Sequence, residues 1–430
     1  MATACAVPID GQNRSLFDAV DDADTDPMTP TTETAIDRYL STVITDLDEF
    51  WEADFPEQYG SRYQPLAEVF PFFASEGRSI RCGSPLPPSA ISQNAIYCSA
   101  GDYVTWDAEI LMPNLNEQFG QFAMGIVLSH EWGHAIQARA RVNTAPVVRE
   151  LQADCFAGAW AGRVRNGESS RLSLTVDEID GALAGFLLLR DPPGTPLGSR
   201  QAHGSAFDRV GAFEEGLTEG NGRCVRYETD GPRALFDIGF TSFEDQQRGG
   251  NLPLGEAFDL VVTDLDAFWL DAIEPRTGQA SFPVDAYSAE SGDVPACPSA
   301  GIEVVRYCPD DQSITVEADQ LAAIHRGIGD FSIGLLLARE WGRGIVSINS
   351  LAHSQREAAV LADCLAGTWA GTLAAGTSAT DISLSPGDLD EAVAVMVGRR
   401  PADLEGIELS AFDRIRAFRT GFTDDAACLR

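Results

Sequence analysis

The sequence contains no lysine: all 30 of its basic residues are arginine, against 65 aspartates and glutamates. The formal net charge at pH 7 is therefore −35. The phosphates of nucleic acids would repel such a chain, so this charge excludes a nucleic-acid partner and also a polybasic contact with a membrane surface. We attribute the missing lysine to coding bias rather than to function.

Long apolar runs are also missing, so the sequence predicts neither a transmembrane helix nor the apolar core of a signal peptide. Near the N-terminus, Cys5 follows small residues and precedes a polar, acidic stretch up to Thr34. This arrangement resembles the mature end of a bacterial lipoprotein, which would make Cys5 a point of membrane attachment through a lipid. The alternative is an ordinary free cysteine in a disordered leader, residues 1–35.

The composition that remains is that of a globular protein. A chain of 430 residues with 44% apolar and 22% charged residues is long enough for two domains with complete cores. Apolar residues recur at helical spacing from Ala35 onward. We place a first domain at residues 36–228, a linker rich in Gly, Gln and Arg at 229–253, and a second domain at 254–430.

One stretch of the first domain has the pattern of a metal site. His130-Glu131-Trp132-Gly133-His134 follows an apolar run, so we expect it in the middle of a buried helix. His130 and His134 are one helical turn apart, roughly 5–6 Å at Cβ, on one face. Two neutral imidazoles so placed can bind one Zn²⁺, with Glu131 beside the metal as a general base. The alternative is two histidines satisfied by hydrogen bonds in a core helix.

A second stretch supplies a third ligand. Glu150 lies sixteen residues after His134, and Asp154 lies one helical turn further on. Two histidines and a glutamate leave one zinc position open for water or substrate, which is the composition of a catalytic site rather than a structural one. Asp154 suits an outer role, in which it accepts a hydrogen bond from the far ring nitrogen of a ligand histidine. A solvated acidic pair on a surface helix is the alternative.

These motifs resemble the predicted neutral zinc metallopeptidases, a bacterial zincin family with a glutamate as third ligand. The resemblance extends over about residues 39–224 and includes the segment 203–209, His-Gly-Ser-Ala-Phe-Asp-Arg. It implies a zincin-like fold, of the α+β class and predominantly helical. It also implies zinc as cofactor, peptidase activity, and a peptide or protein as substrate. The rest of the chain departs from the single-copy pattern of the family.

The second half of the chain repeats the first half. The matching segments are 45–51 with 263–269, 97–98 with 307–308, 125–134 with 334–343, 153–155 with 362–364, and 205–209 with 410–414. In the first of these pairs, Thr-Asp-Leu-Asp-Glu-Phe-Trp returns with one change as Thr-Asp-Leu-Asp-Ala-Phe-Trp. We therefore predict a tandem duplication of one zincin-like domain.

Comparison of the two copies separates scaffold from chemistry. Both copies keep the glutamate and the outer aspartate, as Glu131 and Glu340 and as Asp154 and Asp363. The second copy has lost all three proposed ligands: His130 is replaced by Arg339, His134 by Arg343 and Glu150 by Ala359. A guanidinium group has no lone pair for Zn²⁺. We predict one zinc per chain and a degenerate second site, where Arg339 or Arg343 pairs with Asp363 or Glu340.

Cysteine spacing indicates disulfides rather than a thiolate metal site, because no two cysteines are arranged as C-x-x-C. Eight of the nine cysteines fall at matching places in the two halves, which predicts four disulfides and an extracytoplasmic compartment. Each would stabilise the fold by roughly 2–4 kcal/mol. The alternative is eight buried thiols in a cytosolic protein. The predicted pairs are Cys82–Cys98, Cys155–Cys224, Cys297–Cys308 and Cys364–Cys428.

Three further histidines lie outside the metal motif. His203 differs between the copies, because its counterpart is Glu408, and it is a candidate donor to the oxyanion formed during peptide hydrolysis. The alternative is a loop histidine whose hydrogen bonds hold the turn at Gly204. His325 and His353 have no carboxylate at ligand spacing, so we interpret both as structural or exposed.

A strand is predicted before the histidine helix, over residues 97–110. Within it, residues 101–106 are our candidate for an edge that pairs with an extended peptide substrate. A plain structural hairpin is the alternative. Further along, Thr175 begins another helix, which the Asp-Pro-Pro-Gly segment at residues 191–194 ends.

The leading hypothesis is a zinc-dependent peptidase, secreted or lipid-anchored at the bacterial cell surface. Glu131 would take a proton from a zinc-bound water and deliver it to the leaving amine. The rival is a non-catalytic envelope protein that uses the same scaffold for binding or structure. Against the rival, the first copy keeps even the general base, which a purely structural site would not need. A third possibility makes the second copy a regulator of access to the first.

Overall fold

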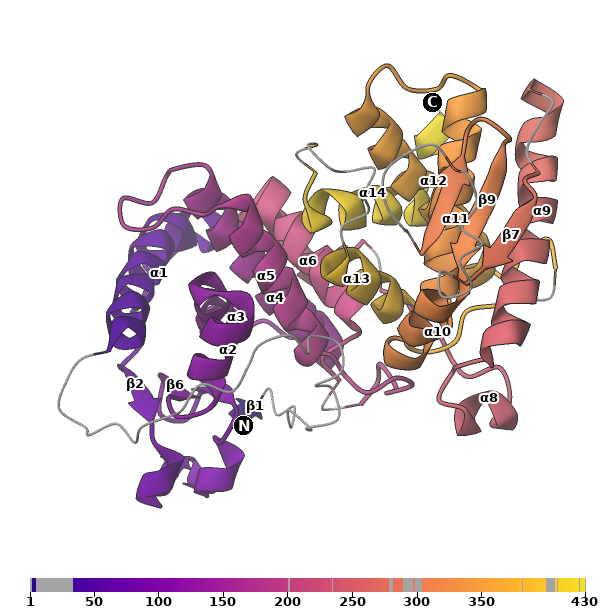
Figure 1. The fold of residues 1–430 in the computed structure, drawn as a ribbon. Coiled ribbons are helices and arrows are strands. Elements are labelled where there is room, and N and C mark those ends of the chain that lie inside the picture. The colour runs from indigo at the N-terminus through magenta and orange to yellow at the C-terminus, as the bar shows by residue number, and fades with distance from the viewer. Residues whose placement is uncertain are drawn as a thin grey trace. The chain divides into compact units, whose positions relative to one another are not determined.

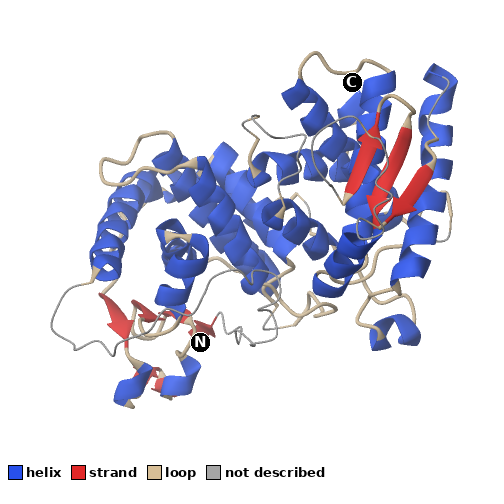
Figure 2. Cartoon of the chain, in the orientation of Figure 1, coloured by secondary structure: helices blue, strands red, loops and turns tan. Residues whose placement is uncertain are grey.

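The computed structural model describes residues 2–4, 34–199, 202–233, 235–277, 281–288, 297, 304–380, 382–399, 407, 409–424 and 426–429. The chain forms two compact units, Met1–Asp237 (unit 1) and Ile238–Arg430 (unit 2), which are coloured from indigo to magenta and from rose to yellow in Figure 1. Helices dominate both units, with few strands, so the class is the expected α+β, mostly helical (Figure 2). Cys5 and most of the predicted leader lie outside the described residues.

Unit 1 starts its first long helix where the sequence predicts. The Thr34 hydroxyl accepts a hydrogen bond from the backbone of Asp37, whose carboxylate accepts one from the Thr34 amide, so a capping box fixes this start. In chain order the helices and strands are β1 (Ala2–Ala4), α1 (Ala35–Tyr59), β2 (Glu68–Phe72), β3 (Ile80–Cys82), β4 (Ser84–Leu86), β5 (Ala95–Cys98), β6 (Tyr103–Asp107), α2 (Leu111–Phe119), α3 (Gln121–Ala140), α4 (Pro146–Arg165), α5 (Val176–Leu188), α6 (Ala206–Glu219) and α7 (Asn221–Val225).

The main sheet of unit 1 has the strand order β1-β5-β6-β2. β5 and β6 form an antiparallel hairpin, and β2 pairs with β6 in parallel, Glu68 opposite Tyr103. Residues 97–110 are therefore not one strand. Strand β6 is hydrogen-bonded on both sides and buried along its whole length, so the prediction of residues 101–106 as a substrate-pairing edge was wrong. The sequence also missed α2, which separates β6 from α3.

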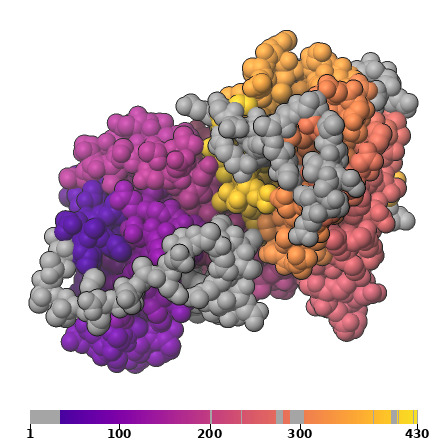
Figure 3. Space-filling model, in the orientation of Figure 1, coloured from indigo at the N-terminus to yellow at the C-terminus, as the bar shows by residue number. Residues whose placement is uncertain are grey.

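Close helix packing depends on small residues at two contacts. Gly133 of α3 faces α4, and a Cβ added there would lie 2.9 Å from the Cα of Ala153. Gly158 of α4 faces α6 instead, and its added Cβ would lie 2.0 Å from the carbonyl oxygen of Phe213. The small residues of α4 thus serve two neighbours, not only the histidine helix that the sequence led us to expect. Figure 3 shows the outer face of the same view as a space-filling surface, in the colours of Figure 1.

Unit 2 has its elements in the same order. Between unit 1 and the first long helix of unit 2, the predicted linker contains a short helix, α8 (Phe243–Gln247). The remaining elements are α9 (Leu254–Thr277), β7 (Val284–Tyr287), β8 (Val305–Cys308), β9 (Ser313–Glu317), α10 (Ala318–Gly327), α11 (Phe331–Ile348), α12 (Gln355–Ala374), α13 (Asp388–Gly398) and α14 (Ala411–Thr423).

Corresponding contacts recur in the two units. The three-stranded sheet β7-β9-β8 repeats the pairing of β2, β6 and β5, with one parallel and one antiparallel pair. The indole N–H of Trp160 donates to Asp46 at 2.8 Å, and that of Trp369 donates to Asp264 at the same distance. Among the described residues of both units, no helix is both long and apolar enough to cross a lipid bilayer.

Four disulfides connect the same cysteines that the sequence comparison pairs. Cys82–Cys98 joins β3 to β5, and Cys155–Cys224 joins α4 to α7. In unit 2, Cys297–Cys308 and Cys364–Cys428 close the corresponding loops. Disulfides of this number are typical of proteins from oxidising compartments.

Candidate metal centre

The three predicted ligands meet inside unit 1, between α3 and α4. α3 is buried from Phe122 to Gln137, which is why its histidines lie in an apolar surrounding rather than in solvent. His130, His134 and Glu150 are only 4%, 5% and 3% exposed. The contact of Gly133 with Ala153 brings the two helices close enough for Glu150 to reach the histidine pair. These three are the described residues of unit 1 that cluster with metal-ligand spacing.

The ligand atoms form a nearly equilateral triangle. The two Nε2 atoms lie 3.1 Å apart, and Oε2 of Glu150 lies 3.4 Å from Nε2 of His130 and 3.3 Å from Nε2 of His134. With Zn–N and Zn–O bonds of 2.0–2.2 Å, a tetrahedral ion separates its ligand atoms by about 3.3–3.5 Å. The triangle therefore has the size that one zinc ion requires.

Asp154 fixes the orientation of the first histidine. Its Oδ1 lies 2.7 Å from Nδ1 of His130, and both carboxylate oxygens accept hydrogen bonds from Arg209, at 2.8 and 2.9 Å. Burial alone would raise the pKa of Asp154, but the charge of Arg209 and the hydrogen bonds from Arg209 and His130 outweigh it and hold the pKa below its usual value. Asp154 is thus an ionised acceptor, so Nδ1 of His130 carries the proton and Nε2 presents its lone pair.

A chain of amides fixes the second histidine. The side-chain nitrogen of Gln137 donates to the carbonyl of Arg149 at 2.6 Å and to Gln152 at 3.1 Å, so its oxygen must face Nδ1 of His134, 3.0 Å away. Gln152 in turn donates to the carbonyl of Cys224 at 3.0 Å. Nδ1 of His134 is therefore the donor, and its Nε2 also presents a lone pair.

This donor set fits a metal cation. Two imidazole lone pairs and one carboxylate converge within 3.4 Å, and Oε2 of Glu150 is buried without a hydrogen-bond partner among the described residues. Three acceptors at this distance repel one another unless a cation lies between them.

Glu131 has a contact that the sequence did not predict. Its Oε2 accepts a hydrogen bond from the backbone amide of Tyr97 in β5 at 2.7 Å, which ties α3 to the sheet. In unit 2, Oε2 of Glu340 accepts from the amide of Tyr307 at 2.9 Å. The glutamate therefore has a structural task in both units. A purely structural site would therefore keep this glutamate too, contrary to the expectation from sequence.

His203 lies in the loop between α5 and α6, next to α4. Its Nδ1 lies 3.0 Å from Oδ1 of Asp191, whose Oδ2 also accepts from the backbone amides of His203 and Gly204. A Cβ on Gly204 would lie 3.4 Å from Leu151, the residue after Glu150. The sequence identified Asp191 only as part of a helix-breaking segment, whereas the structure shows that it orients the histidine.

The corresponding place in unit 2 is filled by arginine. Nε of Arg339 donates to Asp363 at 3.0 Å and its NH1 to Glu340 at 2.7 Å, while Arg343 donates to Glu340 at 2.9 Å. Both contacts expected from the sequence comparison are present. Ala359, at the position of Glu150, is 2% exposed and belongs to an apolar cluster.

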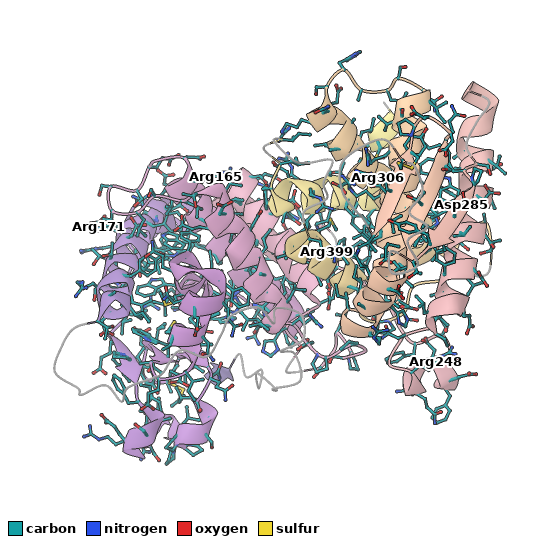
Figure 4. The ribbon with its side chains drawn as sticks, in the orientation of Figure 1. Arg165, Arg171, Arg248, Asp285, Arg306 and Arg399 are labelled. Carbon is teal, nitrogen blue, oxygen red and sulfur yellow. A yellow bond between two sulfur atoms is a disulfide. The ribbon has the colours of Figure 1, made fainter. Side chains whose placement is uncertain are left out.

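Asp363, His325 and His353 of unit 2 make structural contacts. Asp363 also binds Arg414 at 3.2 Å, as Asp154 binds Arg209, and Arg414 donates to the carbonyl of Arg399, labelled in Figure 4. Nε2 of His325 lies 2.8 Å from the carbonyl oxygen of Leu252, which is a structural contact. The backbone amide of His353 donates to Glu357 at the start of α12. Glu408 lies outside the described residues.

The residues that sequence reasoning missed are Gln137, Gln152, Arg209 and Asp191. The two glutamines could have been found by the comparison of copies, because their counterparts at the same offset are Val346 and Leu361. Arg209 could not have been found in this way, because its counterpart Arg414 is also an arginine.

Comparison with known proteins agrees with this geometry. The family described as "Putative neutral zinc metallopeptidase" matches residues 7–226, which is just over half of the chain and falls within unit 1. Two curated relatives, both described as "Uncharacterized protein YpfJ", come from Escherichia coli K12 and from E. coli O6:H1. Each is 25% identical over 206 residues, covering 43% of this chain and 68% of the relative. No solved structure matches the chain. With its His-Glu-x-x-His helix and downstream glutamate in place, the chain belongs to the neutral zinc metallopeptidase family.

Proposed function

We propose that the protein is a zinc-dependent peptidase. His130, His134 and Glu150 hold one Zn²⁺ per chain, and Glu131 is the general base. The observation that carries this proposal is the convergence of three lone pairs within 3.4 Å of one another, two of them fixed in orientation by outer hydrogen bonds.

The residues of the chain divide the chemistry among themselves. Zinc, when bound, supplies Lewis acidity and lowers the pKa of a coordinated water to about 7. The carboxylate of Glu131, held by the Tyr97 amide, accepts the proton of the attacking water and passes it to the leaving amine. His203, oriented by Asp191, donates to the developing oxyanion.

Strand β5 is the proposed place for a peptide substrate. Tyr97 of β5 touches Glu131 directly, so an extended peptide along this strand would lie beside the site. The outer edge of β5 accepts a strand in the structure, because β1 pairs with it antiparallel, with Thr3 opposite Tyr97. We infer that substrate takes this edge by main-chain hydrogen bonding, with β1 displaced.

We also propose a duplication and a location for the whole chain. The matched elements and contacts of the two units support a tandem duplication in which unit 2 is a degenerate copy. The four disulfides support an extracytoplasmic location. A lipid on Cys5 would add attachment to the cell surface.

Metal content and one matched pair of variants test the function. We expect one zinc per purified chain, absent from a His130→Ala/His134→Ala variant. Glu131→Gln should abolish hydrolysis of a mixed peptide library, read by mass spectrometry, while zinc stays bound. The matched control is Glu340→Gln, which alters the equivalent residue of unit 2 and should leave hydrolysis unchanged.

Two results would overturn the proposal. Metal-replete protein without zinc would remove the catalytic centre and favour a binding or structural role. Hydrolysis that survives Glu131→Gln would remove the general base from the mechanism. For His203, His203→Ala should lower turnover with zinc retained, and unchanged turnover would exclude it.

A further inference from the structure

We propose that unit 2 binds a hard divalent cation, best matched by Ca²⁺, between the N-terminal ends of α11 and α13. The ligands are the carboxylates of Asp330, Asp388 and Glu391. This site is separate from the arginine-filled position between α11 and α12, and the proposal is independent of the peptidase function.

The three carboxylates lie together although they come from different segments. Asp330 is the residue before α11, and Asp388 and Glu391 lie in the first turn of α13. One oxygen from each lies within 4.8 Å of the others, and the residues are 8%, 6% and 8% exposed. Ca²⁺ binds oxygen at 2.3–2.6 Å, so two of its ligands are at most about 5 Å apart. The cluster is compact enough for one such ion.

Backbone amides near the helix starts bind oxygens of all three carboxylates, but one oxygen remains without a partner in the described part of the chain. Oδ2 of Asp330 accepts from the amide of Leu252, Oδ2 of Asp388 from that of Ser385, and Oε2 of Glu391 from that of Phe331, each at 2.8 Å. Oδ1 of Asp330, by contrast, is buried and has no hydrogen-bond partner among the described residues. A buried, unpaired carboxylate oxygen costs free energy that a bound cation would recover.

Space for an ion lies beside the cluster. A cavity of about 180 Å³ is lined by Asp330 and Asp388, and Thr241, Asp245 and Ser385 add further oxygens to its wall. This volume holds a cation with several waters, because one water takes up about 30 Å³. Ca²⁺ commonly completes its six to eight ligands with water.

Among the residues that the structure describes, Arg248 and His325 are the positive or titratable basic groups recorded near the cluster. Arg248, labelled in Figure 4, also lines the cavity but pairs with Glu244 at 3.4 Å. His325 faces Asp330 and has its Nε2 2.8 Å from the carbonyl oxygen of Leu252. Burial and the neighbouring charges raise the pKa of Asp388 and of Glu391 well above the usual value. Without a cation the cluster would have to retain protons, and this is the alternative that the experiment must exclude.

In the part of unit 1 that the structure describes, no such cluster occurs at the corresponding place. The backbone amide of Ser385 donates to Asp388 at the start of α13, as that of Thr175 donates to Glu178 in the capping box of α5. By that register Glu391 corresponds to Gly181, where a Cβ would lie 2.3 Å from the carbonyl oxygen of Phe119. The position of Asp330 is occupied by Gln121. Unit 1 therefore has one carboxylate where unit 2 has three.

Calorimetric titration of the zinc-saturated full chain with Ca²⁺ tests the proposal. We expect one Ca²⁺ per chain, and loss of that binding in Asp388→Asn and in Asp330→Asn, each of which keeps side-chain size. The matched control is Glu178→Gln in unit 1, which should bind Ca²⁺ as the wild type does. Mg²⁺ should bind more weakly, because its shorter bonds need a tighter cluster.

A second measurement covers variants that fail to fold. In the wild-type chain at pH 8, Ca²⁺ should raise the temperature at which unit 2 unfolds, followed by circular dichroism. No heat of binding together with no rise in that temperature would overturn the proposal and leave proton sharing as the explanation. Binding that persists in both aspartate variants would also overturn it, because the ion would then lie elsewhere.

Discussion

Units 1 and 2 differ in what lies beside a shared pair of buried carboxylates. In each unit, a buried glutamate from one helix and a buried aspartate from the next lie at the same place, as Glu131 with Asp154 and Glu340 with Asp363. Buried carboxylates need nearby positive charge. Unit 2 supplies it with the guanidinium of Arg339, whereas unit 1 presents histidine lone pairs that fit a metal ion. The comparison teaches that the same pair of buried carboxylates can lie beside fixed arginines or beside a set of metal ligands.

The outer hydrogen bonds changed together with the ligands. In unit 1, Gln137 and Gln152 form the relay that orients His134, and their counterparts Val346 and Leu361 cannot hydrogen-bond through their side chains. The aspartate–arginine pair behaves differently, because Asp154–Arg209 and Asp363–Arg414 are present in both units. The relay therefore belongs to the metal site and the ion pair belongs to the fold.

The largest effect that would sharpen this comparison concerns the two ion pairs. In the zinc-loaded protein, Arg209→Met leaves Asp154 without a permanent positive partner and should destabilise unit 1 by about 3–5 kcal/mol. Arg414→Met should destabilise unit 2 by less, because Asp363 keeps Arg339 at 3.0 Å. Urea unfolding of both variants measures the difference, and equal losses would break the comparison.

The glutamine relay is expected to have an intermediate effect, on zinc affinity. Gln137→Val gives unit 1 the residue that unit 2 has, and should weaken zinc binding by about 10–100-fold, because His134 loses the group that fixes its tautomer. Competition with a chromophoric chelator measures the affinity. Val346→Gln, the reverse change in unit 2, should create no zinc binding. Unchanged affinity in Gln137→Val would show that the relay is only structural.

The smallest effect concerns pH. Burial would raise the pKa of Asp191, but hydrogen bonds from His203 and Gly204 outweigh it and hold the pKa below its usual value. A lowered pKa contributes stability that is present above the unfolded value, about 3.9, and is lost as the pH falls through the folded value. In Asp191→Asn, the free energy of unfolding of unit 1 should therefore depend less steeply on pH, but only below about pH 4. A change of slope near pH 7 instead would contradict this assignment.

Sequence reasoning reached the site because its signals are local. His130, His134 and Glu131 are fixed by helical spacing, and internal repetition identified the four cysteine pairs. It failed where structure depends on distant segments. The parallel pairing of β2 with β6 joins residues 68–72 to residues 103–107, and no local pattern in either segment reveals it. For this reason an interior strand was taken for an edge.

Polar residues inside helices were the second kind of failure. Gln152 and Arg209 have no spacing that distinguishes them from surface residues, and only the fold shows that they are 1% exposed. The acidic cluster of unit 2 was missed for the same reason. Asp330 lies 58 positions before Asp388 in the chain, and only helix packing brings the two carboxylates together.

The hydrogen bond between strand and glutamate has a consequence for how metal sites of this kind are recognised from sequence. Because Glu131 and Glu340 both hold a strand amide, selection for folding alone would preserve this residue after catalysis has ended. A search that counts the glutamate as the signature of a working peptidase would therefore include inactive descendants. The positions of the two histidines are more informative, because unit 2 has Arg339 and Arg343 there while it keeps the glutamate.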